Sequence, residues 1–377
     1  MLPLSLYIHI PWCVRKCPYC DFNSHKSPEV LPEEDYVQAL IADLKHDVQH
    51  EPSRTLQSIF IGGGTPSLFS ARAYETLFHG IRALIPFAHD IEITLEANPG
   101  TVEQFRFNDY RQLGINRLSI GIQSFNPAHL RALGRIHDDQ QAHRAIAAAR
   151  NAGFDNINID IMHGLPKQTT EEGLADLQTA LEHQPEHLSW YQLTIEPNTV
   201  FYKKRPTLPS EDDSCALEDA GLALLEKHRY KRYEISAFCK NEQSARHNLN
   251  YWRFGDYYGI GAGAHGKLTS ADGTGIHRTR KHRQPTDYLN ADKPFLSATH
   301  AVSPKELVFE FMLNTTRLQE PIPHVLFVAR TGLPIDALLP GLNQAQSKGL
   351  IVMTDTHWQV TPFGRRYTNN LQALFLP

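Results

Sequence analysis

The sequence contains no apolar run that approaches the ~18–20 residues a membrane-spanning helix requires. Its first residues, MLPLSLYIHIPWC, carry no basic side chain before Arg15 and no small-residue cleavage site, so they do not predict a signal peptide. Positive charge is not in excess, because 37 Lys and Arg residues face 41 Asp and Glu residues and give a net charge of −4. Proteins that wrap nucleic acid are normally basic. These absences predict a cytoplasmic protein with no transmembrane segment and no nucleic-acid partner.

Cysteine is also scarce, with five residues in a chain of 377. An odd and small number in a large cytoplasmic chain argues against a disulfide framework. Three of the five, Cys13, Cys17 and Cys20, nevertheless fall within eight residues. Clustered thiols in a reducing compartment more often hold a metal or perform redox chemistry than pack a core. This short segment is therefore the first candidate site.

Strand-like and helix-like segments alternate over the first half of the chain, which predicts βαβ units and a parallel sheet. Six segments have the pattern of strands: Leu4–Ile10, Gln57–Ile61, Ile91–Glu96, Arg117–Ile122, Asn156–Met162 and His187–Ile195. Six units are too few for a closed eight-stranded barrel, so we predict an α/β fold with a partial (β/α)6 barrel. A doubly wound dinucleotide fold is disfavoured, because GGGTP at residues 62–66 lacks the GxGxxG spacing.

The pattern loosens after about residue 200, and the length exceeds one ordinary domain of ~100–200 residues. Four features follow in order: a helix near Asp213–Lys227, a strand over Arg232–Ala237, a glycine- and aromatic-rich stretch over Tyr251–Gly266, and a basic segment over Ile276–Pro285. From Pro304, helical patterns lead to a hairpin over Ile351–Val360 and a last helix. We therefore predict a smaller C-terminal α+β winged-helix-like domain, with domains at residues 1–285 and 300–377.

The cysteine segment reads Cys13-Val-Arg-Lys-Cys17-Pro-Tyr-Cys20 and follows the first predicted strand directly. Three thiolates on a tight loop can each bind one iron of a 4Fe-4S cube and leave the fourth iron open to another ligand. Zinc is the main alternative, but structural zinc sites usually take four ligands from paired CxxC motifs, and no second pair exists here. The pattern therefore favours an iron–sulfur cluster.

A CxxxCxxC loop after a strand of an incomplete barrel resembles the radical S-adenosylmethionine (SAM) superfamily. The resemblance implies that the open iron binds SAM and that an electron from the cube cleaves it to an adenosyl radical, chemistry that belongs to the cofactor. Seven segments in order resemble the oxygen-independent coproporphyrinogen III oxidase-like (HemN/HemW) family over about residues 4–270: YIHIPWC, GGGTPS, EANPG, GIQSF, LGRIH, NIDIMHGLP and GIGAGAHG. The segment after residue 300 is similar to the appended domain of that family.

The resemblance implies a set of SAM contacts, which are Tyr7, Tyr19, Gly63, Gly64, Thr65, Glu96, Gln123, Arg135 and Asp160, beside the cluster ligands Cys13, Cys17 and Cys20. The residue types suit these roles, because glycines allow close backbone approach and carboxylates pair with cationic groups. Alternation along the first strand turns Tyr7 toward the barrel interior. Some of these residues also have a plain structural alternative. Glu96 and Asp160 could be helix caps or salt-bridge partners, Gln123 could satisfy backbone groups, and residues 62–64 could form an ordinary strand–helix turn.

This chain departs from the oxidases that it resembles at one position of the cysteine loop. The oxidases have the pattern CxxxCxxCxC, with a further cysteine two residues after the third, and Phe22 stands at that position here. The chain also enters its first strand by Leu4, without the longer N-terminal segment of the oxidases. Both features resemble the HemW branch, which is regarded as haem chaperones. The resemblance implies three bound groups, namely a 4Fe-4S cluster, SAM and haem, and partners that accept haem, such as respiratory haem proteins met in transient contact at a membrane.

A second HemW resemblance is HNLNYW at residues 247–252. It makes His247 the candidate haem-iron ligand, with Tyr251 and Trp252 as walls of a porphyrin site, since neutral imidazole is a common axial ligand. His265 is a weaker rival whose glycine-rich setting favours closure of the barrel beneath SAM. The run His277–Arg283 could pair with haem propionates, but a solvated basic loop is the preferred interpretation. Most of the 20 histidines must be surface or hydrogen-bonded core residues.

Two alternative functions stay open at this point. The first is a radical SAM enzyme that oxidatively decarboxylates coproporphyrinogen III to protoporphyrinogen IX, against which Phe22 and the short N-terminus argue. The second is nucleic-acid binding through the winged-helix-like unit, which rests on fold analogy alone. That unit contains Lys348, Arg365 and Arg366 but no dense basic patch.

Overall fold

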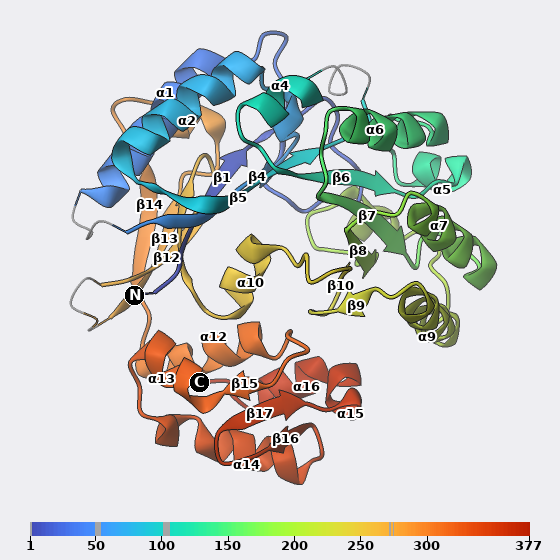
Figure 1. Ribbon diagram of the computed structural model, residues 1–377, viewed down its shortest axis with the longest axis vertical. Coiled ribbons are helices and arrows are strands. Elements are labelled where there is room, and N and C mark those ends of the chain that lie inside the picture. The colour runs from blue at the N-terminus through green and yellow to red at the C-terminus, as the bar shows by residue number, and fades with distance from the viewer. Residues whose placement is uncertain (1, 50–53, 101–105, 271–272, 274) are drawn as a thin grey trace.

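The computed structural model describes residues 2–49, 54–100, 106–270, 273 and 275–377. Within these residues one curved sheet dominates, flanked by helices on its outer side (Figure 1). Its strand order is β14 (Leu296–Ala301), β13 (Ile276–Lys281), β12 (His265–Thr269), β11 (Asp256–Ile260), β1 (Leu4–Ile10), β4 (Leu56–Gly63), β5 (Phe87–Ala97), β6 (Arg117–Gln123), β7 (Ile157–His163), β8 (His187–Gln192), β10 (Ala237–Cys239) and β9 (Lys231–Arg232). The six predicted strands are confirmed as β1 and β4 to β8, with ends that differ by a few residues.

The contacts of β1 agree with the alternation predicted for the first strand. Leu6, Ile8 and Ile10 of β1 are fully buried and join the main core with Leu40 of the covering helix α1 (Glu33–Val48). Tyr7 lies on the other face, where its ring stacks 6.3 Å from that of Phe60. Successive strand residues point to opposite faces, so one face packs on helices and the other forms the barrel interior.

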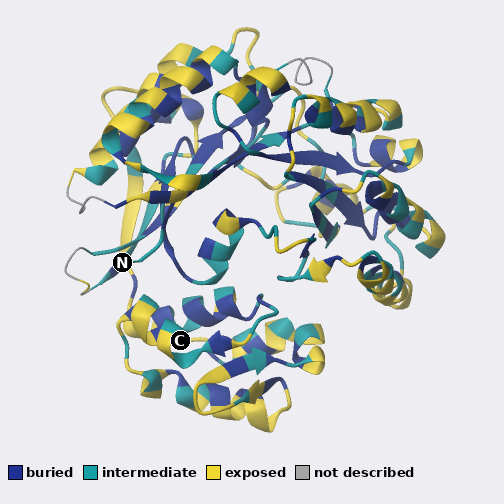
Figure 2. Cartoon of the chain, in the orientation of Figure 1, coloured by how far each residue is buried: buried dark blue, intermediate teal, exposed yellow. Residues whose placement is uncertain are grey.

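The remaining helices of this part are α2 (Ala71–Leu84), α4 (Phe107–Gln112), α5 (Pro127–Ala132), α6 (Asp139–Asn151), α7 (Thr170–Glu182), α8 (Val200–Lys204), α9 (Glu211–Lys227), α10 (Arg246–Trp252) and α11 (Pro285–Tyr288). Capping boxes begin α6 at Asp138 and α7 at Thr169, each with a side chain that accepts from the third helical residue. Figure 2 shows the result, with buried strands inside and helices exposed on their outer faces. The partial (β/α)6 barrel is thus the architecture of this part.

Two predictions for the region after residue 200 were wrong, and one strand was not predicted. The glycine- and aromatic-rich stretch supplies β11, a seventh parallel strand that pairs with β1 from Leu4↔Asp256 to Ile8↔Ile260. The basic segment is no solvated loop, because Ile276–Lys281 is β13, paired on both sides. The strand predicted over Arg232–Ala237 is broken by a turn, in which Glu234 Oε1 accepts from Ser236 N (2.9 Å). These strands are short, with two to six residues each, and left too little periodicity to be recognised.

The C-terminal part has its own core and carries the predicted helices and hairpin. It comprises α12 (Pro304–Thr315), β15 (Ile322–Pro323), α13 (His324–Thr331), a 3-10 turn (Ile335–Ala337), α14 (Leu339–Ser347), β16 (Ile351–Met353), β17 (His357–Val360), α15 (Pro362–Arg366) and α16 (Thr368–Ala373). The three strands pair in the order β15-β17-β16, so helices followed by a small wing confirm the winged-helix-like class. Phe254 and Ile276, from before this part, are buried within the same core.

Candidate functional site

The cysteine loop follows the carboxyl end of β1 and is fixed at its base by a short parallel ladder. This ladder pairs β2 (Trp12–Cys13) with β3 (His25–Lys26). The three thiols are half-buried and free of disulfides, and burial raises the pKa of Cys13 and Cys20. Among the described residues, no group of three or more His, Cys, Asp or Glu side chains is placed to hold a single metal ion. A 4Fe-4S cube takes one thiolate per iron, so its three sulfurs need not converge on one ion.

The loop forms one wall of a cavity of about 810 Å³ at the carboxyl ends of the parallel strands. This edge is where a barrel of βα units carries its functional residues. Most of the predicted site residues line it: Cys13, Cys17, Tyr19, Cys20, Gly63, Gly64, Thr65, Glu96, Gln123, Arg135 and Asp160. We call this space the cluster cavity. Residues from six separate elements therefore converge where the sequence analysis placed one site.

The backbone of Gly63, Gly64 and Thr65 is held more tightly than a plain strand–helix turn. Gly64 N donates to Ile10 O (2.7 Å) and Thr65 N to Trp12 O (2.8 Å), while Gly63 N donates to Glu96 Oε2 (3.0 Å). A Cβ atom on Gly64 would lie 2.5 Å from the Trp12 carbonyl oxygen, so glycine is required for the cysteine loop to approach. The three backbone N–H groups of this turn already donate hydrogen bonds within the protein. A ligand would therefore contact the carbonyl oxygens of the turn and the Thr65 hydroxyl.

Two carboxylates, Glu96 and Asp160, line the cavity, and the environment disfavours the ionised form of each. Burial, with the nearby charge of Asp160, raises the pKa of Glu96 to about 7. Burial also raises the pKa of Asp160, although this carboxylate accepts hydrogen bonds from Ser119 Oγ (3.0 Å) and Asn158 Nδ2 (2.8 Å). A bound group with positive charge would relieve both shifts. The two carboxylates therefore suit the sulfonium and ammonium charges of SAM.

Arg135 is positioned between the cysteine loop and the barrel interior. Its Nη2 donates to Asn98 Oδ1 (2.5 Å) and Gly121 O (2.6 Å), and its Nη1 lies 3.8 Å from Cys17 Sγ. Its buried Nε has no hydrogen-bond partner among the described residues. A guanidinium with an unused donor in such a cavity is suited to a carboxylate.

Gln123 ends β6 in a strained conformation, with φ = 72° at a non-glycine residue. Pairing with β7 shifts its register between Gly121 and Gln123, which turns the Gln123 side chain toward the cavity. Tyr191 from β8 holds it there by donating to its Oε1 (2.7 Å).

Sequence reasoning missed several cavity residues. Asn98 bridges Thr65 Oγ1 (2.9 Å) and Arg135, and its place in the EANPG motif was the available signal. Tyr191 and Arg317 also line the cavity, but neither lies in a motif that could have identified it.

Tyr7 and His247 do not line the cluster cavity. The Tyr7 hydroxyl pairs instead with His9 Nδ1 (2.9 Å). His247 is 1% exposed on α10, which lies against the inner side of β4 (Figure 1). Its Nδ1 pairs with Ser58 Oγ (3.0 Å) and its Nε2 with the Tyr251 hydroxyl (2.8 Å), so neither ring nitrogen is free for iron in this conformation.

The weaker histidine rival lies elsewhere. His265 is exposed at the start of β12, while the preceding glycines pack beneath the cysteine loop. A Cβ atom on Gly261 would lie 2.3 Å from His9 O, and Asn23 Nδ2 donates to Ala262 O (2.9 Å). The glycine-rich stretch therefore packs against the base of the cysteine loop, and its closure of the barrel beneath SAM stays a prediction.

The fold and the cavity define a radical SAM protein with a HemN-type C-terminal domain. The Radical SAM superfamily profile matches residues 7–180, and the HemN C-terminal domain profile matches residues 302–367. Coproporphyrinogen III oxidase (HemN) from Escherichia coli superimposes with a TM-score of 0.83 over 99% of this chain and 90% of that chain. Their sequences are 24% identical, so this likeness establishes the fold alone.

Sequence relatives narrow the class further. The heme chaperone HemW of Escherichia coli is 51% identical over 99% of this chain and 98% of its own length. The heme chaperone HemW proteins of Haemophilus influenzae and Bacillus subtilis are 49% and 33% identical, again over 99% of this chain and at least 98% of theirs. The chain belongs to the HemW family. Within the described residues no helix has the length and apolar content to cross a membrane.

Proposed function

We propose that this protein is a haem chaperone that binds a 4Fe-4S cluster, SAM and haem and passes haem to acceptor proteins. The observation that carries the proposal is the convergence of the three-cysteine loop and the predicted SAM residues on one cavity. The full-length similarity to proteins named heme chaperones supports the choice of cargo.

Cys13, Cys17 and Cys20 would hold the cluster, which when bound supplies an open iron and a reducing electron. Glu96 and Asp160 would balance the positive charges of SAM, and the unused Nε of Arg135 suits its carboxylate. The turn at Gly63 to Thr65 contributes acceptors. The buried hydrogen bonds that fix these groups favour a preorganised site.

His247 remains a predicted iron ligand. Burial lowers its pKa to about 3, so its ring is neutral, as iron ligation requires. Ligation in this place requires the bond to Ser58 or to Tyr251 to break and α10 to move, because the ring is fully enclosed.

We infer that the protein works in the cytoplasm and meets respiratory haem proteins by transient contact at the membrane. Phe22 supports chaperone function over coproporphyrinogen oxidation, because this side chain is 60% exposed where the oxidases have a further cysteine. Loading an apo-haem protein from the haem-bound chain, followed by its absorbance, tests transfer directly.

The cofactor proposal is tested by anaerobic reconstitution with iron and sulfide. Cys17→Ala should lose the cluster absorbance and the bound iron, whereas Cys215→Ala, at an exposed free thiol outside the loop, should retain both. Haem titration of the reconstituted protein should reach one haem per chain, and a protein that binds none would refute the chaperone function. Formation of protoporphyrinogen IX from coproporphyrinogen III with SAM and dithionite would assign the oxidase function instead.

A further inference from the structure

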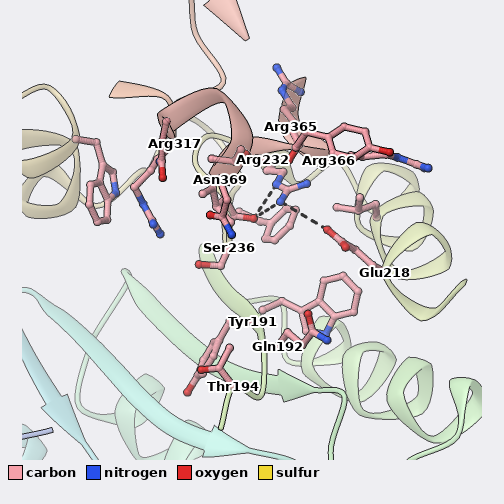
Figure 3. A pocket seen from close by; sticks show the side chains of 18 of the residues that line it. Tyr191, Gln192, Thr194, Glu218, Arg232, Ser236, Arg317, Arg365, Arg366 and Asn369 are labelled. Carbon is pink, nitrogen blue, oxygen red and sulfur yellow. Dashed lines mark hydrogen bonds and ion pairs between the residues drawn. The ribbon is translucent and has the colours of Figure 1, made fainter. Parts of the chain in front are cut away.

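A second cavity of about 740 Å³ lies between the β8–β10 edge of the sheet and the C-terminal part (Figure 3). Its barrel side is formed by residues of β8, α9 and β10, and its other side by residues of α12, α15 and α16. The volume is within the ~300–1,000 Å³ range of small-molecule and cofactor sites. We call this space the interdomain cavity.

The interdomain cavity borders the cluster cavity directly. Tyr191, Gln192, Thr194 and Arg317 line both spaces. Figure 3 shows the first three along one side of the interdomain cavity and Arg317 on the opposite side. A ligand in this cavity would therefore lie next to the proposed SAM site.

Flat apolar surfaces occur on both of its sides. Trp190 and Phe238 come from the barrel strands, Tyr367 comes from the C-terminal part, and Trp252 comes from α10. The Trp252 ring also stacks beneath the Arg317 guanidinium at 4.3 Å. Aromatic side chains of this kind suit the faces of a planar macrocycle.

The charged groups are predominantly cationic. Four arginines line the cavity, Arg232, Arg317, Arg365 and Arg366, against the single carboxylate Glu218. Arg317 is paired with Glu234 (3.3 Å) and Arg366 with Asp219 (3.0 Å), both outside the cavity lining. Arg232 and Glu218 approach only to 3.8 Å, whereas no acidic partner of Arg365 is found among the described residues. The Nε atoms of Arg317 and Arg365 are buried without a hydrogen-bond partner. Unused guanidinium donors in a partly enclosed space are suited to carboxylates.

His163, at the end of β7, lines this cavity with its imidazole ring. The residue is 5% exposed, and its ring lies 4.3 Å from that of Trp190. Its Nδ1 is fully buried without a hydrogen-bond partner in the part of the chain that the structure describes, so an iron ion would have to bind at Nε2. Burial, with the charge of Arg232, lowers the pKa of His163 to about 4, so its ring is neutral and keeps its lone pair.

We propose that the interdomain cavity is the haem-binding site, with His163 as axial ligand to the iron and with Arg365 and Arg317 paired to the propionates. The assignment rests on the proposed chaperone function and names the place where the cargo is held. It differs from ligation by His247, whose nitrogens are both hydrogen-bonded, because His163 requires no bond to break.

The test is titration of the reconstituted full-length protein with haem and, separately, with iron-free protoporphyrin IX. His163→Ala should weaken haem binding at least tenfold and change the haem absorbance, while protoporphyrin binding stays within twofold of the parent. Added imidazole should restore the parent absorbance. Arg365→Met should weaken both porphyrins several-fold, because each carries the propionates. His46→Ala, at an exposed histidine on α1, is the matched control and should change neither.

Cluster content and SAM binding report whether each variant is folded, and His163→Phe preserves the ring against Trp190 if alanine proves unstable. Parental haem affinity and absorbance in His163→Ala and His163→Phe would overturn the site while leaving the chaperone function intact. If iron ligation is lost in His247→Phe but kept in the His163 variants, the site is likewise overturned and the chaperone function stays intact. A parent protein that binds no haem would overturn both proposals.

Discussion

Replacing Glu96 by Gln should make the protein more stable at pH 8 than its parent. The carboxyl is enclosed at the end of β5, and burial beside Asp160 raises its pKa to about 7. Glutamine retains the shape and hydrogen-bonding capacity of a protonated carboxyl but cannot ionise. The substitution therefore removes the cost of an enclosed anion.

The sign and size of this change in stability follow from the difference between the pKa of Glu96 in the folded and in the unfolded protein. Between the ordinary carboxyl pKa of 4.5 and about 7, folded protein retains a proton that the unfolded chain has released, so the free energy of unfolding falls as pH rises. At 1.4 kcal/mol per unit this shift corresponds to about 3 kcal/mol. Because the effective dielectric constant of buried sites in proteins is about 20, well above that of a dry interior, we expect a smaller effect of roughly 2 kcal/mol.

Urea denaturation of the cluster-free protein at pH 5 and pH 8 measures this effect. The difference in unfolding free energy between Glu96→Gln and the parent should be larger at pH 8, in favour of the variant. Asp160 is present in both proteins, so the difference reports on Glu96. A difference that is equal at the two pH values, or larger at pH 5, would refute the reasoning. If the cavity holds SAM, parental affinity for SAM should rise over the same pH range, and that of the variant should not.

Three further substitutions test the fold around the site. Gly64→Ala should destabilise the protein by about 2 kcal/mol and reduce cluster content, because its Cβ would collide with the backbone of Trp12; normal iron incorporation would contradict this. Lys281→Met should cost about 3–5 kcal/mol in thermal or urea unfolding, since it leaves Asp43 buried without its cation, and a neutral result would count against that ion pair. Thr169→Ala should cost about 1 kcal/mol through loss of the α7 cap, whereas Thr169→Ser should retain most of it.

Much of the barrel could be predicted because local pattern and tertiary environment agree. The alternation of Leu6, Ile8 and Ile10 with Tyr7 encodes which face of β1 meets the helices. β11 could not be recognised in the same way, since Asp256–Ile260 becomes a strand through pairing with β1, far away in sequence. Long-range pairing of a short segment leaves little periodic signal.

The cluster cavity was predictable from motifs, but its internal geometry was not. Sequence order indicated that Gly64 and Arg135 belong to one site; the commitment of the Gly64 N–H to Ile10 and the bridge from Arg135 to Asn98 depend on the folded backbone. The interdomain cavity is even harder to predict from the sequence, because no single motif contains its residues. His163 and Arg365 lie in separate segments that only the docking of the C-terminal part brings together.

The core of the C-terminal part includes two side chains from the preceding part, which affects how the chain unfolds. Phe254 and Ile276 are 1% and 2% exposed because residues after Val302 cover them. A chain that stops short of Val302 would present these two side chains to water and lose one wall of the interdomain cavity. The C-terminal part is therefore no detachable accessory, and a denaturation experiment on the whole chain should register its melting together with that of the β11–β13 segment.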